Sequence, residues 1–172
     1  QILSSSCVKD AMKKVKLMAD LIASTEKAPY PVFAIDTDGK VIAWNKEMER
    51  VTEIPAHDMI GKGDHAYAVP FYGKARPMLV DYLILPNPGS DAGISRDVLS
   101  SKPETVRILG RFQLMWGRGT RIYDENGTII AAVQSIGIHD PVPPGKQVDR
   151  EKAADEVIPD YESLAGPAPP AR

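Results

Sequence analysis

The chain contains a single cysteine, Cys7, among its 172 residues. One cysteine excludes an internal disulfide framework and any zinc or iron–sulfur site that needs several cysteines. The chain also lacks an excess of charge, with 21 basic and 23 acidic residues, which argues against a nucleic-acid-binding protein because such proteins usually carry a marked basic excess. No apolar run approaches the roughly 18 residues of a membrane span. Because no signal peptide is evident either, we expect a cytoplasmic protein.

Hydrophobic residues make up 43% of the chain and charged residues 26%, a composition typical of a folded globular protein. Proline is unevenly distributed: none occurs before Pro29, and seven fall within 141–172. This distribution predicts three parts, namely a helix at 1–28, a folded domain at 29–140 and a proline-rich, largely disordered tail at 141–172. The chain begins with Gln1 rather than Met, as a processed protein or a fragment would.

Residues 1–28 are predicted to form one amphipathic helix. The serines at 4–6 provide N-cap oxygens, and apolar residues then recur at spacings of four, three, four and three, as in a heptad seam: Val8, Met12, Val15, Ala19 and Ile22. The seam has two interpretations, because the helix either packs on its own domain or pairs with the same helix of a second copy. Two heptads are too short for a coiled coil that is stable by itself.

Two β-strands and a short helix begin the folded domain. The apolar runs 32–36 and 41–44 flank a Thr-Asp-Gly-Lys turn at 37–40, so they predict a β-hairpin. Asn45 stands where a helix N-cap belongs, and the helix that it starts ends before Pro55. A loop-rich stretch at 54–75 follows, with one helical turn at 58–60. Apolar residues at helical spacing then predict a helix within 76–85.

From Glu104 onward the hydrophobic period becomes two, which indicates strands. Phe112, Leu114 and Trp116 share one face of a long strand, and the glycines within 117–120 predict a kink or bulge in it. An Asp-Glu-Asn-Gly turn at 124–127 leads to the last strand at 129–136. A short helix is expected at 95–99, ahead of these strands. Helices grouped between antiparallel strands indicate the α+β class.

These motifs, in this order, resemble the PAS sensor-domain family. The first of them is the run 31–39 with its Asp-Thr-Asp-Gly turn, followed by Ile-Ala-Trp-Asn at 42–45, and the second is the pair of runs 123–130 and 132–136. The resemblance covers about residues 29–140. Gly-Lys-Gly-Asp at 61–64, Val-Pro-Phe-Tyr-Gly at 69–73 and Arg-Pro-Met-Leu at 76–79 are similar to a PAS subgroup found beside bacterial and archaeal signalling kinases.

The resemblance implies a five-stranded antiparallel sheet with short helices on one face and a space between them that often holds a small ligand. It also implies that a helix ahead of the first strand mediates dimerisation, which favours the paired interpretation of 1–28. PAS domains often continue into a signalling helix, but Pro141 interrupts a helix at that place. The signal therefore leaves by another route, for which the N-terminal helix is a candidate, or the domain ends here. A downstream kinase or other output domain is the implied partner.

The sequence contains no convincing catalytic constellation. His57, His65 and His139 share no metal-ligand spacing, so we expect neither enzyme activity nor a metal site. The resemblance bears on cofactors too. Flavin-binding PAS photosensors carry a reactive cysteine within the domain, whereas Cys7 precedes it. Haem-binding members use a histidine on the helix that corresponds to 76–85, which has none. The cofactor is therefore unknown, with flavin photochemistry and haem both disfavoured.

The sequence is compatible with a small-molecule ligand. An amphipathic pocket with one cation for an anionic group would be lined by Trp44, Tyr67, Arg76, Met78, Tyr82 and Trp116. Core packing is the simpler explanation for each apolar member, and a surface salt bridge for the arginine. The sequence thus predicts a non-catalytic sensory domain of a signal-transduction protein, as in two-component systems, that binds a small ligand, forms a homodimer, or does both. The alternative is a PAS-type protein–protein interaction module without a ligand.

Overall fold

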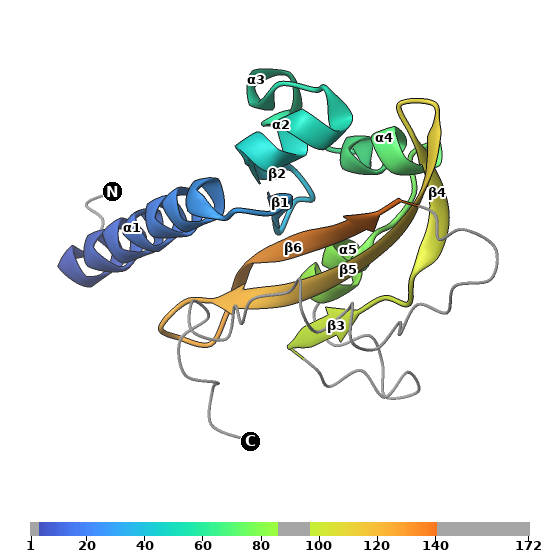
Figure 1. Ribbon diagram of the computed structural model, residues 1–172. Coiled ribbons are helices and arrows are strands. Elements are labelled where there is room, and N and C mark those ends of the chain that lie inside the picture. Colours follow the sequence, from blue (N-terminus) through green and yellow to red (C-terminus); the bar gives the residue numbers. More distant parts are fainter. Residues whose placement is uncertain (1–3, 86–96, 141–172) are drawn as a thin grey trace, which may run out of the picture.

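The computed structural model describes residues 4–85 and 97–140, and the predicted tail at 141–172 lies outside them. Within the described residues the elements are, in chain order, α1 (Ser5–Lys27), β1 (Val32–Asp36), β2 (Val41–Trp44), α2 (Lys46–Thr52), α3 (Ala56–Met59), the 3-10 helix η1 (Ala66–Ala68), α4 (Val69–Tyr72), α5 (Leu79–Ile84), β3 (Val98–Ser100), β4 (Glu104–Ile108), β5 (Arg111–Tyr123) and β6 (Ile129–His139) (Figure 1). The helical turn expected at 58–60 is α3, which starts earlier. Helices η1 and α4 lie in the stretch 54–75 that was predicted mainly as loop.

The strands form one antiparallel sheet in the order β2-β1-β6-β5-β3, with β4 also paired to β5. The α+β class predicted from the sequence is confirmed. The described residues form six strands rather than five, because two separate strands line the same edge of β5: β3 pairs with residues 118–120 and β4 with residues 111–115. The short helix expected at 95–99 is wrong for residues 98 and 99, which belong to β3.

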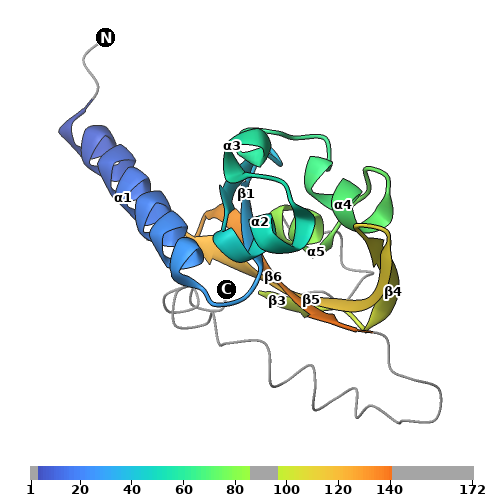
Figure 2. The ribbon, with the colours of Figure 1, turned by 45° about the horizontal axis from the view of Figure 1, so that its top comes forward.

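The two faces of the sheet pack against different helices (Figure 2). Helices α2 to α5 cover one side, the inner face, whose core includes Phe33, Ile35, Trp44, Ala132 and Ile136. The C-terminal part of α1 packs on the opposite side, the outer face, whose core includes Leu21, Val32, Ala34, Ile122 and Val133. The N-terminal half of α1 continues past this core toward the β5–β6 turn, where Lys13 Nζ lies 2.9 Å from Glu125 Oε2. The sheet therefore lies between the inner helices and α1.

The two hairpin turns predicted from the sequence close in the same way. In the β1–β2 turn, Asp36 Oδ1 accepts hydrogen bonds from the backbone N–H groups of Asp38 at 2.9 Å and Lys40 at 3.0 Å. In the β5–β6 turn, Asp124 Oδ1 accepts the equivalent bonds from the residues two and four positions further on. Each turn also needs a residue of positive φ, which a glycine supplies at 76° and 75° respectively.

Helix α5 lies directly on the backbone of β5. A Cβ atom at Gly119 would stand 2.6 Å from Leu83 Cδ1, and one at Gly117 would stand 3.4 Å from Leu79 Cδ1. A bulge at these glycines, one of the two expected features, is wrong, because β5 and β6 stay in register from residue 114 to residue 122. The glycines serve instead to let the helix approach the sheet closely.

A substitution at Gly137 tests how closely the outer face is packed. An alanine methyl group here would overlap the ring of Trp116, which lies directly opposite on β5. We expect Gly137→Ala to lower the free energy of unfolding by about 1–3 kcal/mol because the ring must move. In the control Gly63→Ala, the nearest atom to the new methyl is 3.8 Å away, so the effect should stay within about 0.5 kcal/mol. Urea unfolding measures both, and equal losses would contradict this packing.

Candidate functional site

Three of the six predicted pocket residues are buried in the inner core. Trp44 packs against Phe33 with ring centroids 5.9 Å apart, and its Nε1 donates to the carbonyl oxygen of Ile54 at 3.0 Å. Tyr67 packs against the same phenylalanine at 5.1 Å. Met78 is buried at the N-cap position of α5. These contacts are those of core residues.

The other three predicted pocket residues lie apart from that core. Arg76 is exposed, with its guanidinium carbon 4.1 Å from the centroid of the Tyr72 ring, and Tyr82 is exposed on α5. Trp116 is buried on the outer face and stacks on His139 with centroids 5.4 Å apart, whereas α5 covers the inner face. The structure therefore does not bring the six predicted residues together, because the sheet separates Trp116 from α5. A period of two shows which residues share a face but not which of the two faces it is.

Gln134 is a polar side chain that the sequence analysis missed. It lies on β6 at the inner face, is 3% exposed and reaches toward Gly117, where an added Cβ would stand 2.6 Å from its Nε2. Its Oε1 is buried and has no hydrogen-bond partner among the described residues. A buried acceptor without a partner costs about 1–3 kcal/mol. A polar residue in the middle of the apolar run 129–136 was the signal available in the sequence.

The Asp81 carboxylate organises the N-terminal end of α5. It accepts hydrogen bonds from the backbone N–H of Met78 at 2.7 Å and from the hydroxyl of Tyr67, and His65 Nε2 lies 3.1 Å from it. These groups border a groove of about 420 Å³ between the β1–β2 turn and α5. Within residues 4–85 and 97–140, no group of three or more His, Cys, Asp or Glu side chains could hold a metal ion. The carboxylate thus fixes the start of a helix.

A buried guanidinium holds the C-terminal end of the same helix. Arg121 on β5 is 4% exposed, and it donates from Nε to the carbonyl oxygen of Leu83 at 2.8 Å and from Nη2 to that of Leu85 at 3.4 Å. The last carbonyl groups of a helix have no partner within it, and a cation there is also favoured by the helix dipole. Arg121 therefore ties the C-terminal end of α5 to the sheet, whereas Asp81 ties its N-terminal end to η1 through Tyr67.

Helix α1 packs on its own domain through one face and leaves most of the predicted seam in solvent. Leu21 and Thr25 are buried against the outer face. The five seam residues are exposed or, for the last, half-buried: Val8, Met12, Val15, Ala19 and Ile22. The exposed fraction reaches 67% at Met12 and 69% at Val15. At 100° per residue, Leu21 points about 140° away from the centre of the seam. Four of the five seam residues therefore lie off the face by which α1 packs on its own domain, whereas Ile22 packs against the outer core.

Neither α1 nor any other helix in the described part of the chain is long and apolar enough to cross a membrane.

Comparisons with known proteins concern the fold. The family described as the PAS fold matches residues 18–63. The PAS domain of BvgS from Bordetella pertussis is similar, with a TM-score of 0.51, 12% identity and coverage of 72% of this chain and 86% of that one. A Rhodobacter sphaeroides LOV protein is similar with a TM-score of 0.50, 11% identity and coverage of 81% and 73%. The PAS domain of an HTR-like protein from Haloarcula marismortui is similar with a TM-score of 0.47, 13% identity and coverage of 76% of this chain and 99% of that one. Identities this low bear on the fold alone.

Burial of the Tyr67 phenol leads us to expect that the free energy of unfolding falls at alkaline pH. Burial, with a smaller effect of the hydrogen bond to Asp81, raises the pKa of Tyr67 above its usual value. The folded protein therefore keeps this proton longer than the unfolded chain, so its contribution to stability is complete below about pH 10 and is lost as the pH rises further. Tyr67→Phe should reduce this loss, with a remainder from Tyr72, whose pKa burial also raises.

Urea unfolding between about pH 9 and pH 11 measures this dependence, because an unperturbed tyrosine titrates within that interval. Tyr82→Phe is the control, since it removes an exposed hydroxyl from α5 itself. An alkaline loss of stability that is the same in Tyr67→Phe as in the parent protein would contradict the assignment.

Proposed function

This chain is a PAS domain by its fold, and from that premise we propose that it is a non-catalytic sensory module whose α1 helix pairs with the α1 helix of a second copy to relay a signal.

The exposed seam of α1 is the observation that carries the proposal. Its side chains at 8, 12, 15 and 19 lie in solvent, on the side of the helix away from the domain. Their spacing of four and three residues matches the same spacing on an identical helix. Burying a valine or methionine side chain is worth about 1.5–3 kcal/mol, so pairing removes from water what a single copy leaves exposed. A second copy is thus the partner that fits the seam.

The lysines beside the seam favour a parallel pair. With Val8 and Val15 at heptad positions d, Lys9 and Lys16 occupy positions e. In an antiparallel pair the e positions of the two helices face each other, so the lysines would repel. In a parallel pair each e position faces a g position of the other helix, and residues 11 and 18 at g are alanine and methionine.

A small ligand on the inner face is the second part of the proposal. The unpaired Oε1 of Gln134 supports it, because a ligand N–H or O–H group would supply the missing hydrogen bond. Leu79 and Leu83 already pack against the glycines of β5, so a ligand enters only if α5 moves. A ligand that binds the displaced arrangement better would shift the population toward it. The close packing of α5 is the observation that favours the alternative, an interaction module without a ligand.

The remaining points of the proposal rest on the family resemblance. They are a cytoplasmic location, a two-component or similar pathway with a downstream kinase or other output domain, and the lack of enzyme activity. We assign neither haem nor flavin to the domain, because His65 pairs with Asp81, His139 stacks on Trp116, and Cys7 lies on α1 away from the inner face.

Val15→Glu tests the pairing of α1. A carboxylate in the seam would have to lose its hydration on pairing, so we expect the dimer dissociation constant to rise more than about tenfold. Cys7→Glu is the matched control, since it adds the same charge to an exposed position of the same helix outside the seam. Sedimentation equilibrium of the full chain measures both. A dimer that Val15→Glu leaves intact would show that the seam is not the interface, and a monomeric parent protein would refute the pairing.

Gln134→Met tests the ligand. The variant keeps the length of the side chain but removes the unpaired acceptor, so we expect the ligand-free protein to become more stable and to lose any stabilisation by a ligand. Gln113→Met on β5, where the glutamine is only half-buried, is the control. A thermal-shift screen of the three proteins against metabolites measures the effect. If no compound stabilises the parent protein, the interaction module without a ligand is the better description.

A further inference from the structure

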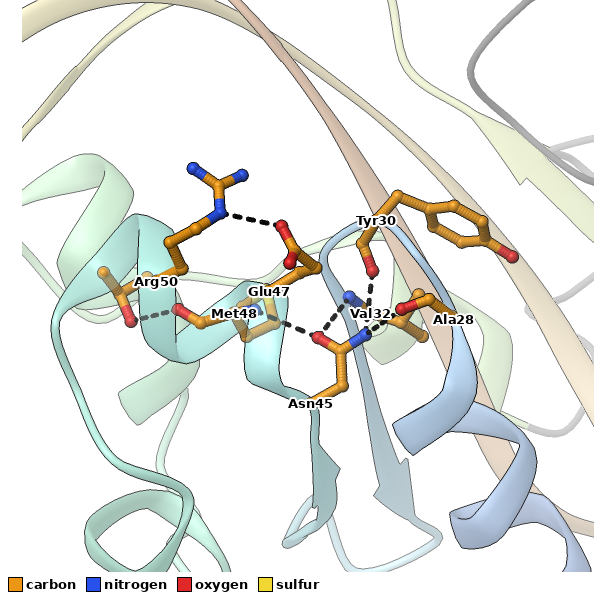
Figure 3. Close-up of polar contacts among 8 residues, drawn as sticks. Ala28, Tyr30, Val32, Asn45, Glu47, Met48 and Arg50 are labelled. Atoms are coloured by element: carbon orange, nitrogen blue, oxygen red, sulfur yellow. Dashed lines mark hydrogen bonds and ion pairs between the residues drawn. The ribbon is translucent and has the colours of Figure 1, made fainter.

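The side chain of Asn45 lies where three elements of the chain meet (Figure 3). It follows the last residue of β2, caps α2 and is 1% exposed. The sequence predicted only the cap. In the structure both ends of the amide are engaged, and most of the groups that they contact belong to other elements.

The amide oxygen of Asn45 binds backbone N–H groups at the start of two elements. Oδ1 accepts a hydrogen bond from the N–H of Val32, the first residue of β1, at 3.1 Å, and from the N–H of Met48 in the first turn of α2 at 3.0 Å. Both donors belong to segments that carry the inner core, because Phe33 and Met48 are buried in it.

The amide nitrogen of Asn45 contacts carbonyl oxygens at the C-terminal end of a third element, α1. Nδ2 lies within hydrogen-bond distance of the carbonyl oxygens of Thr25 at 3.2 Å, Ala28 at 3.4 Å and Tyr30 at 2.8 Å. The first two belong to the last turn and the C-cap of α1. The carbonyl oxygen of Thr25 also accepts the N–H of Ala28 at 3.3 Å, and the amide nitrogen of Asn45 attaches this last turn of α1 to the residue that follows β2.

We infer that Asn45 is a positioning residue that couples the inner face to α1. Its oxygen is bonded to β1 and α2, and its nitrogen contacts the end of α1, the helix that carries the seam. A displacement of α2 or of the end of β2 therefore changes the position of α1 through one rigid amide. This inference rests on the proposed function, since the relay has a purpose only if α1 pairs with a second copy.

Asn45→Asp separates the two ends of the amide. Aspartate caps a helix as well as asparagine does, so the bonds to Val32 and Met48 are retained. Its second oxygen, however, faces carbonyl oxygens and cannot donate to them. We expect amide hydrogen exchange in residues 21–27 of α1 to accelerate about tenfold or more, which is the loss of one or more hydrogen bonds. Exchange in β1 and α2 should stay within about twofold of the parent rate.

Asn45→Ser provides a second, uncharged variant. Serine is also a good N-cap, but its side chain is too short to bridge to α1 and carries no amide. We expect the same local acceleration in α1, so the test remains decisive if the charged variant folds poorly.

Thr52→Val is the matched control. Thr52 is buried at the other end of α2, where its Oγ1 donates to the carbonyl oxygen of Met48 at 2.6 Å and accepts the N–H of Ile54 at 3.3 Å. Its loss should accelerate exchange in α2 and leave α1 unchanged. If Asn45→Asp and Asn45→Ser accelerate β1, α2 and α1 alike, or if Thr52→Val accelerates α1 equally, Asn45 acts only in stability and the coupling is refuted. Exchange reports on α1 in a monomer as well as in a dimer, so failure of the pairing is seen separately.

Discussion

The rest of the structure depends on the buried amide of Asn45. An amide carries a donor and an acceptor, so one side chain can satisfy N–H groups on one side and carbonyl groups on the other. Here the N–H groups open β1 and α2, and the carbonyl groups belong to the end of α1 and the segment that follows it. A buried backbone group without a partner costs about 1–3 kcal/mol, so no other element can replace this junction cheaply.

On the inner face, both ends of α5 are held by hydrogen bonds, while one buried polar atom of the sheet beneath it has no partner. Asp81 and Arg121 hold α5 at its two termini, and the glycines of β5 allow the helix to lie against the sheet. Between these points the amide oxygen of Gln134 is buried without a partner. This acceptor lies next to Gly117, on the strand that α5 covers.

The two faces of the sheet pack against different parts of the chain. The inner face holds the helices and the unpaired acceptor, whereas the outer face holds the C-terminal half of α1 and Trp116. Most of the seam of α1 points away from both. Because the sheet lies between the inner helices and α1, the side chain of Asn45 is a direct connection between α2 and the end of α1.

The sequence by itself determined the features that depend on near neighbours. The Asp and Gly of each hairpin turn, the cap at Asn45, the α+β order and the 4-3 spacing on α1 all follow from residues within a few positions of one another. Only the tertiary structure decided that Trp116 faces away from α5, that Gly117 and Gly119 admit a helix instead of forming a bulge, and that Oε1 of Gln134 is left unpaired. Alternation along a strand cannot tell the two faces of a sheet apart, and the carbonyl groups that Asn45 contacts on α1 lie 17 and 20 positions away. Contacts of that kind exist only once the chain has folded.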